Sequence, residues 1–138
     1  MPAQDKFLES VLRALIKDGW TITAQELHLP FDANNSYVDF LAERTLIAER
    51  GADKIAVEVK TFAGKSVLSE FEKALGQFLV YKIGLKLAEM EHDLYLAAPA
   101  DMLAFFKRPA VTQLRQTYGI KVVIYDVEKE EIAEWIEP

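Results

Sequence analysis

The sequence predicts an α/β (α+β) domain in which a mixed central sheet is flanked by helices, and three observations carry this prediction. Two long segments place apolar residues at three- and four-residue spacing, which is typical of amphipathic helices. Several short segments alternate apolar and polar residues or are rich in β-branched residues, which is typical of strands. The two kinds of segment follow each other closely, so helices are expected to cover a sheet.

The size and composition fit one folding unit. The chain has 138 residues, of which 51% are hydrophobic and 28% are charged. The sequence shows no internal repeat, low-complexity tract or Pro/Gly/Ser-rich linker. We therefore expect residues 1–138 to form a single domain.

The first predicted helix runs from about Asp5 to Lys17. Gly19 is placed to end it, because glycine readily adopts the conformation that terminates a helix. Its apolar stripe consists of Phe7, Leu8, Val11, Leu12, Leu15 and Ile16.

Strands are expected to follow this helix, at residues 20–23, 36–43, 45–50 and 54–62. The segment 29–36 is expected to be a loop, because it contains Pro30 and two adjacent asparagines. A tight turn at 51–53 would join the last two strands. We expect these strands to form an antiparallel meander of three or four strands.

The second half of the chain is expected to continue with a helix from Ser66 to about Leu87, with Ser66 as its cap. A buried strand at 93–99 follows it. The remaining elements are one or two short helices at 100–118 broken near Pro109, a core strand at 121–126, and an edge strand or short helix at 130–136.

Composition excludes several classes of protein. Because the chain has no cysteine, disulfides, thiolate catalysis and Cys-rich zinc sites are excluded. The formal net charge of -6 is opposite to that of proteins that coat nucleic acid, so any DNA contact would be local or assisted by a metal ion or a partner. The N-terminal stretch does not resemble a signal peptide and no segment is long and apolar enough to span a membrane, so a cytoplasmic protein is expected.

The segment KIAVEVKTF at 54–62 carries the first candidate functional residues. Successive side chains of a strand point to opposite faces, so Glu58 and Lys60 share one face while the apolar residues between them share the other. Asp39 lies nineteen positions before Glu58, in the pattern D-x18-E-x-K. We expect the two acids to lie on neighbouring strands of one sheet.

This trio suits metal-assisted chemistry on a phosphate. Asp39, Glu58 and the backbone carbonyl of Val59 offer the oxygen ligands that Mg2+, or Mn2+, prefers. Lys60 could orient a metal-activated water or neutralise charge that develops during phosphodiester hydrolysis. The alternative is structural, since a Glu-x-Lys pair on a strand is common as an ion pair on a solvated face.

The second predicted helix adds Gln77 and Tyr81, one turn apart on its polar side. The order of a helix, Asp39, the Glu58-x-Lys60 strand and a helix with Gln77 resembles the PD-(D/E)xK nuclease superfamily, whose restriction endonuclease-like core is αβββαβ.

This resemblance implies roles for particular residues. Asp39, Glu58 and Lys60 would be the signature residues, and Gln77 would support phosphate or metal positioning. The resemblance also matches Glu9 to an acidic metal-site residue on the first helix. The chain departs from the pattern at position 38, where a valine replaces the proline.

A closer resemblance covers the whole chain in six ordered blocks: MPAQDKF, ALIKDGWTIT, YVDFLAER, IAERGADKIAVEVKTF, ALGQFLVY and VIYDVEKEEI. These blocks are similar to the XisH family, the fdxN element excision controlling factors of cyanobacteria. The resemblance implies an accessory role in programmed excision of a DNA element. It further implies action together with a site-specific recombinase and a small companion protein of the XisI family.

Two functions therefore remain open beside the structural alternative. The chain is expected to be a Mg2+-dependent DNA endonuclease or nicking factor, with Lys65 in the loop after the site as a further phosphate contact. Alternatively, it is a non-catalytic, nuclease-like regulatory subunit that acts through its protein partner. Trp135 and Ile136 near the C-terminus are expected to form an exposed surface for a partner or a homodimer.

Overall fold

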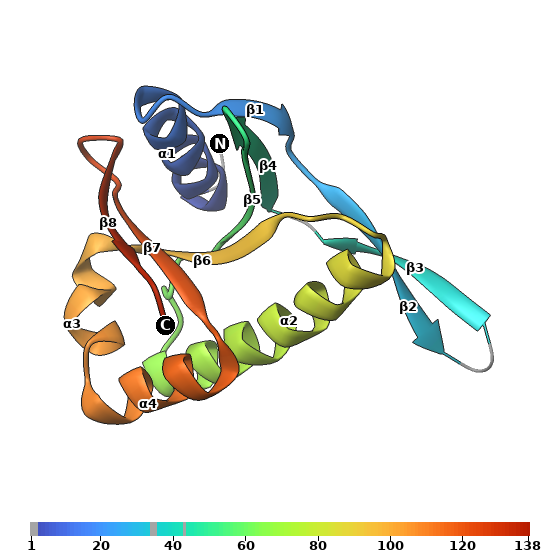
Figure 1. The fold of residues 1–138 in the computed structure, drawn as a ribbon. Coiled ribbons are helices and arrows are strands. Elements are labelled where there is room, and N and C mark those ends of the chain that lie inside the picture. The colour runs from blue at the N-terminus through green and yellow to red at the C-terminus, as the bar shows by residue number, and fades with distance from the viewer. Residues whose placement is uncertain (1–2, 34–35, 43) are drawn as a thin grey trace.

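The structure is a computed structural model that describes residues 3–33, 36–42 and 44–138, with the backbone alone for 3–5, 33 and 36–40. Within these residues the chain forms a six-stranded sheet in the order β1-β4-β5-β6-β7-β8 (Figure 1). The strands are β1 (Thr21–Ala24), β4 (Thr45–Arg50), β5 (Asp53–Val59), β6 (Asp93–Pro99), β7 (Lys121–Asp126) and β8 (Glu131–Ile136). β5, β6 and β7 are parallel, while β1, β4 and β8 join antiparallel. The predicted mixed sheet is confirmed.

Helices cover both faces of this sheet. α1 (Ala3–Lys17) packs on one face, and α2 (Val67–Leu87), α3 (Leu103–Phe106) and α4 (Pro109–Tyr118) pack on the other. A short 3-10 helix, η1 (Ala100–Met102), directly precedes α3. Strand alternation sends Val57 toward α1 and Ala56 toward α2. Glu58 therefore belongs to the α2 face.

Most element boundaries agree with the predictions from the sequence. α1 ends before Gly19, which has a φ of +90°, a conformation that favours glycine. Ser66 caps α2 by accepting a hydrogen bond from the backbone N–H of Ser69 at 3.2 Å. Pro109 begins α4, where an N–H would have no hydrogen-bond partner within the helix.

The predicted loop at 29–36 is wrong, because most of it belongs to the strand β2 (Leu27–Ala33). β2 pairs with β3 (Ser36–Ala42) in a two-stranded ribbon that projects from the body (Figure 1). Pro30 is tolerated because both strands of such a ribbon are edges. Leu29, which is fully buried, anchors β2 on α2 beside Gly84. Asn34 and Asn35 lie outside the described residues.

The predicted strand pairing of the antiparallel meander is also wrong. In the described backbone β3 pairs with β2, and the antiparallel part of the main sheet next to β5 consists of β1 and β4. Asp39 pairs with Pro30 in the ribbon, whereas Glu58 lies in the main sheet. The two acids are therefore on different sheets, contrary to the expectation from their spacing.

The expected exposed surface at the C-terminus is wrong as well. β8 pairs with β7 and places Trp135 opposite Val123, on the face that α1 covers. The Trp135 ring centroid lies 6.0 Å from that of Trp20 and 5.0 Å from that of Tyr95. Ile136 is only 7% exposed. Ile136 is therefore a core residue, and Trp135 is partly buried against the core, so the two do not form the exposed apolar surface that was expected.

A buried arginine ties the C-terminal segment to the helices. Arg115 is 5% exposed and donates hydrogen bonds to the carbonyls of Phe106 (3.0 Å) and Glu137 (3.1 Å) and to Thr112 Oγ1 (3.2 Å). Arg115→Met is expected to lower the free energy of unfolding by about 2–4 kcal/mol, because it leaves the buried Phe106 carbonyl and the part-buried Glu137 carbonyl without these donors. Urea titration checks this, and a loss below about 0.5 kcal/mol would contradict it.

In the part of the chain that the structure describes, no helix is long and apolar enough to cross a membrane.

Candidate metal and phosphate site

A polar cavity of about 380 Å³ lies where β5 ends beside α2. It is lined by Leu41, Arg44, Glu58, Val59, Lys60, Thr61, Phe62, Glu70, Gln77 and Tyr81. The structure thus brings together the predicted residues Glu58, Val59, Lys60 and Gln77. Strand alternation on β5 and the polar flank of α2 make them converge.

Glu58 and Lys60 form a direct ion pair in this cavity. Lys60 Nζ lies 3.1 Å from Glu58 Oε1 and also donates a hydrogen bond to Gln77 Oε1. The Glu58 side chain is 2% exposed and that of Lys60 27% exposed, so this is not the solvated surface pair of the structural alternative. Among the described residues, the other carboxylate oxygen, Glu58 Oε2, has no hydrogen-bond partner.

The pKa of Glu58 is raised from its ordinary value. Burial is the main cause, and the charge and hydrogen bond of Lys60 offset it in part. The ionised carboxylate is therefore incompletely compensated, because one oxygen is paired and the other has no partner among the described residues. A cation bound at Oε2 would supply the missing interaction.

Backbone contacts fix the strand end that carries these groups. The Lys60 N–H donates to the Ala97 carbonyl at 3.0 Å, and the Tyr125 hydroxyl donates to the Lys60 carbonyl at 2.9 Å. Tyr125 is fully buried and its pKa is raised, first by desolvation, so it is a neutral donor. The Lys60 side chain thus projects from a rigid point of the sheet.

Arg44 and Glu70 are cavity residues that sequence reasoning missed. Arg44, with a φ of 57°, receives a hydrogen bond from the Val59 N–H at its carbonyl (2.9 Å), and its Nε donates to the Val59 carbonyl at 3.4 Å. Nothing in the local pattern marks this turn residue. Glu70 could have been found, because it precedes Gln77 by two turns on the same flank of α2.

Asp39 and Glu9, the other two predicted residues, are not among the described residues that line the cavity. Asp39 is on β3, two positions before the cavity residue Leu41, and its side chain lies outside the described ones. The structure does not bring Glu9 to the cavity, because α1 packs on the opposite face of the sheet. Glu9 is 50% exposed and pairs with Arg13 at 3.8 Å.

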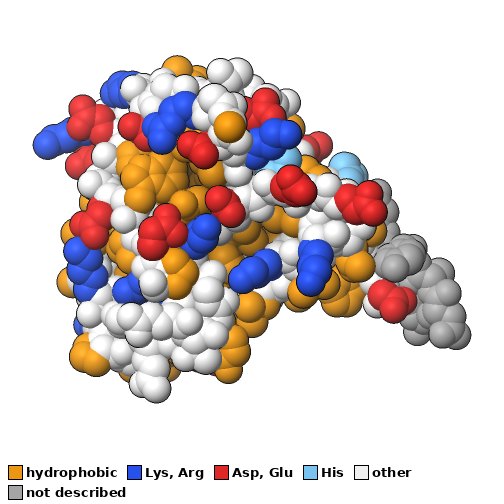
Figure 2. All heavy atoms as spheres, viewed as in Figure 1, with side chains coloured by type: hydrophobic (Ala, Val, Ile, Leu, Met, Phe, Trp, Pro, Cys, Tyr) orange, Lys and Arg blue, Asp and Glu red, His pale blue; other side chains and the backbone are white. Residues whose placement is uncertain are grey.

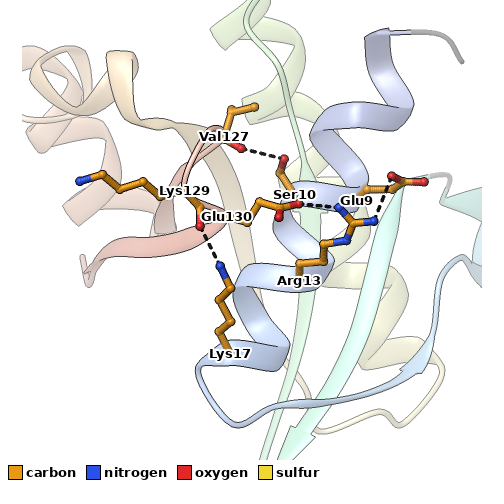
Figure 3. Close-up of polar contacts among 7 residues, drawn as sticks. All are labelled: Glu9, Ser10, Arg13, Lys17, Val127, Lys129 and Glu130. Carbon is orange, nitrogen blue, oxygen red and sulfur yellow. Dashed lines mark hydrogen bonds and ion pairs between the residues drawn. The ribbon is translucent and has the colours of Figure 1, made fainter.

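The surroundings of Glu9 have a structural role instead (Figure 3). Arg13 lies 2.8 Å from Glu130, and Ser10 Oγ donates to the Val127 carbonyl at 3.1 Å. Lys17 Nζ donates to the Lys129 carbonyl at 2.8 Å. These contacts tie α1 to the turn between β7 and β8.

Within the described side chains, no group of three or more His, Asp or Glu residues is arranged to hold a metal ion. Among the oxygen donors at the candidate site are the Glu58 carboxylate, the Val59 carbonyl and the Glu70 carboxylate. This donor set is composed of hard oxygens and suits Mg2+ or Mn2+ in chemical type.

Comparisons with known proteins place the chain in a family. Residues 1–133 match the family described as XisH protein. Two crystal structures are similar, one of an XisH family protein from Nostoc punctiforme and one of an fdxN element excision controlling factor protein from Anabaena variabilis. Each is 39% identical to this chain, with a TM-score of 0.82. Each match covers 96% of this chain, and it covers 99% of the Nostoc chain and 98% of the Anabaena chain. No curated protein matches.

The family match spans nearly the whole chain, and the fold agrees with both crystal structures over nearly all of their length. The resemblance expected from the six sequence blocks is confirmed. The chain belongs to the XisH family.

Proposed function

We propose that this protein is an excision controlling factor that binds Mg2+ and hydrolyses DNA phosphodiester bonds at the Glu58 cavity. The observation that carries the proposal is the buried Glu58 carboxylate, with one oxygen paired to Lys60 and the other unpartnered among the described residues. Support for a role in excision comes from the related protein of Anabaena variabilis, which is described as an fdxN element excision controlling factor.

In this proposal Glu58 Oε2, the Val59 carbonyl and Asp39 hold the metal ion, and Glu70, which lines the same cavity, supports it. When bound, the ion would polarise the phosphate and acidify a water molecule. Lys60 orients the attacking water or neutralises charge on the phosphate, and Gln77 fixes the Lys60 ammonium group.

DNA contact in this proposal is local. The net charge of -6 opposes broad binding to a polyanion, but Arg44 and Lys60 line the cavity itself. Lys65 lies in the loop between β5 and α2 and could add a phosphate contact at the rim. Binding is therefore expected to depend on the metal ion more than on long-range attraction.

The test is calorimetric titration of Mg2+ and Mn2+ into wild type and Asp39→Asn, followed by incubation of supercoiled plasmid with the same samples. Metal binding and nicking are expected for wild type and are expected to fall at least about tenfold for Asp39→Asn, which loses a charged ligand. Glu9→Gln is the matched control, because this carboxylate is exposed and lies on the other face of the sheet. A wild type that neither binds metal nor nicks DNA would refute the proposal.

A non-catalytic role is the second candidate, favoured by the negative net charge. In this case the chain is a nuclease-like regulatory subunit, and a small XisI-like companion protein supplies the basic surface that reaches DNA or the site-specific recombinase. Co-purification would give a stable complex whose DNA binding is unchanged in Asp39→Asn. If DNA binding by the complex requires Asp39, the metal-dependent proposal is favoured instead.

A further inference from the structure

α2 carries an apolar stripe on the side that faces away from the sheet. Its inner side is buried through Phe71 and Phe78, as expected for a helix that covers a sheet. On the opposite side, Val80, Ile83 and Leu87 follow at three- and four-residue spacing and are 38%, 48% and 40% exposed. Figure 2 shows hydrophobic side chains along the margin of the molecule below α2. A helix with apolar residues on both sides is expected to be covered on both sides.

Gly76 leaves a notch in the same stripe, one turn before Val80. A Cβ added at Gly76 would meet no described atom within 4 Å outside its own helix backbone, so the site is open. Glycine in the middle of a helix lowers helix stability, and its use here is explained if another chain approaches closely. The stripe therefore combines projecting aliphatic side chains with a notch into which an aliphatic side chain of another chain can fit.

Charged residues mark the two ends of the stripe. Glu72 and Lys86 are both exposed and lie on the same flank of α2. They are about 21 Å apart along the helix, so they cannot pair within one molecule. A second α2 that runs antiparallel would bring Glu72 of each copy to Lys86 of the other. The same alignment places Ile83 of each copy at the Gly76 notch of the other.

We propose that the outer face of α2 is the interface of a twofold-symmetric homodimer in which the two α2 helices pack antiparallel. A symmetric interface requires one patch that is complementary to itself, and this stripe has that property in shape and in charge. The aliphatic residues supply the affinity, while the two exposed ion pairs fix the direction and register of the helices. This interface is independent of the Glu58 site and replaces the C-terminal surface expected from the sequence.

The first test is sedimentation equilibrium of the full chain. Wild type is expected to dimerise, and Ile83→Glu is expected to be monomeric because it places two carboxylates in the notches. Ile16→Glu is the control, since Ile16 is 52% exposed on α1, away from α2. A wild type that stays monomeric at about 1 mM, where even weak specific association is detected, would overturn the proposal. So would an Ile83→Glu protein that dimerises as tightly as wild type.

The second test exchanges the charges. Glu72→Lys and Lys86→Glu are each expected to weaken the dimer about five- to tenfold, because two attractive pairs become repulsive. The double variant Glu72→Lys/Lys86→Glu is expected to regain the wild-type dissociation constant. Recovery can come only through a second copy, since the two residues are too far apart within one helix. A double variant that is as weak as the single variants would refute the antiparallel register.

The third test uses the absence of cysteine from the chain. Val80 lies near the proposed twofold axis, so Val80→Cys is expected to form a disulfide-linked dimer when oxidised glutathione is added. Gln25→Cys, at an exposed position after β1, is the control and is expected to remain monomeric on a denaturing gel. Equal cross-linking of the two variants would contradict the proposed interface.

Discussion

Replacing Glu58 with methionine is expected to stabilise the metal-free protein while removing metal binding. The wild-type carboxylate is buried, with one oxygen unpartnered among the described residues, so its desolvation is incompletely offset. Methionine has a similar length and carries no charge. We expect the free energy of unfolding at pH 8 to rise by about 1–2 kcal/mol in the absence of metal.

The pH dependence of this gain follows from the raised pKa of Glu58. An acid whose pKa is higher in the folded state binds its proton more tightly there, so it favours folding at low pH. Wild type loses stability as the pH rises from the ordinary glutamate pKa toward the raised value. The advantage of Glu58→Met is therefore expected to vanish below about pH 4, where the carboxyl is protonated in both states, and to be larger at pH 8 than at pH 4.

Urea titrations of both proteins at pH 4 and pH 8 measure this difference, and calorimetry with Mg2+ measures the loss of binding. Glu9→Met is the control, because Glu9 is 50% exposed, and its effect is expected to stay within about 0.5 kcal/mol. If Glu58→Met is less stable than wild type at pH 8, the carboxylate is better compensated than the contacts of the described residues indicate.

Replacing Lys60 with methionine is expected to have the opposite effect. Lys60 supplies the ion pair to Glu58, so its loss leaves a buried carboxylate without its cation. Breaking a buried pair is costly, but Lys60 is 27% exposed and Glu58 can take up a proton. We therefore expect a loss of about 1–3 kcal/mol at pH 8 that shrinks as the pH falls.

Thermal or urea unfolding of Lys60→Met across this pH range measures the effect. Lys65→Met is the matched control, because it removes the same charge from an exposed position in the loop before α2 and is expected to change stability little. Equal losses for the two variants at pH 8 would show that the Lys60 ion pair contributes nothing specific.

Local sequence patterns predict most of the fold because most elements have a clear periodicity. The apolar stripe of α1, the cap at Ser66 and the β-branched core strands are all local signals. The strand β2 and its pairing with the predicted strand β3 escape such patterns, because Pro30 argues against a strand unless both strands are edges. The partial burial of Trp135 depends on its contacts with Trp20 and Tyr95, which are distant in the sequence.

The candidate site is predictable to the extent that its residues share a strand or a helix. Glu58 lies near the end of β5 and Lys60 follows directly after it, one residue beyond Val59, so the predicted strand at 54–62 is shorter than expected but still places both residues at the cavity. Gln77 lies on the flank of α2 that faces them. Arg44 could not be predicted, because it enters the cavity through a turn and a backbone contact with Val59. The spacing of Asp39 indicates a neighbouring strand but cannot indicate a separate sheet.

The anchoring of β2 on α2 through Leu29 has a consequence for the cooperativity of the proposed site. Asp39 is carried by the ribbon, whereas Glu58 is fixed in the main sheet. Local opening of a two-stranded ribbon requires less free energy than global unfolding. The two acids would therefore separate whenever the ribbon undocks, while the rest of the domain stays folded. Amide hydrogen exchange in β2 and β3 would then report the assembly of the site, and exchange in β5 the stability of the domain.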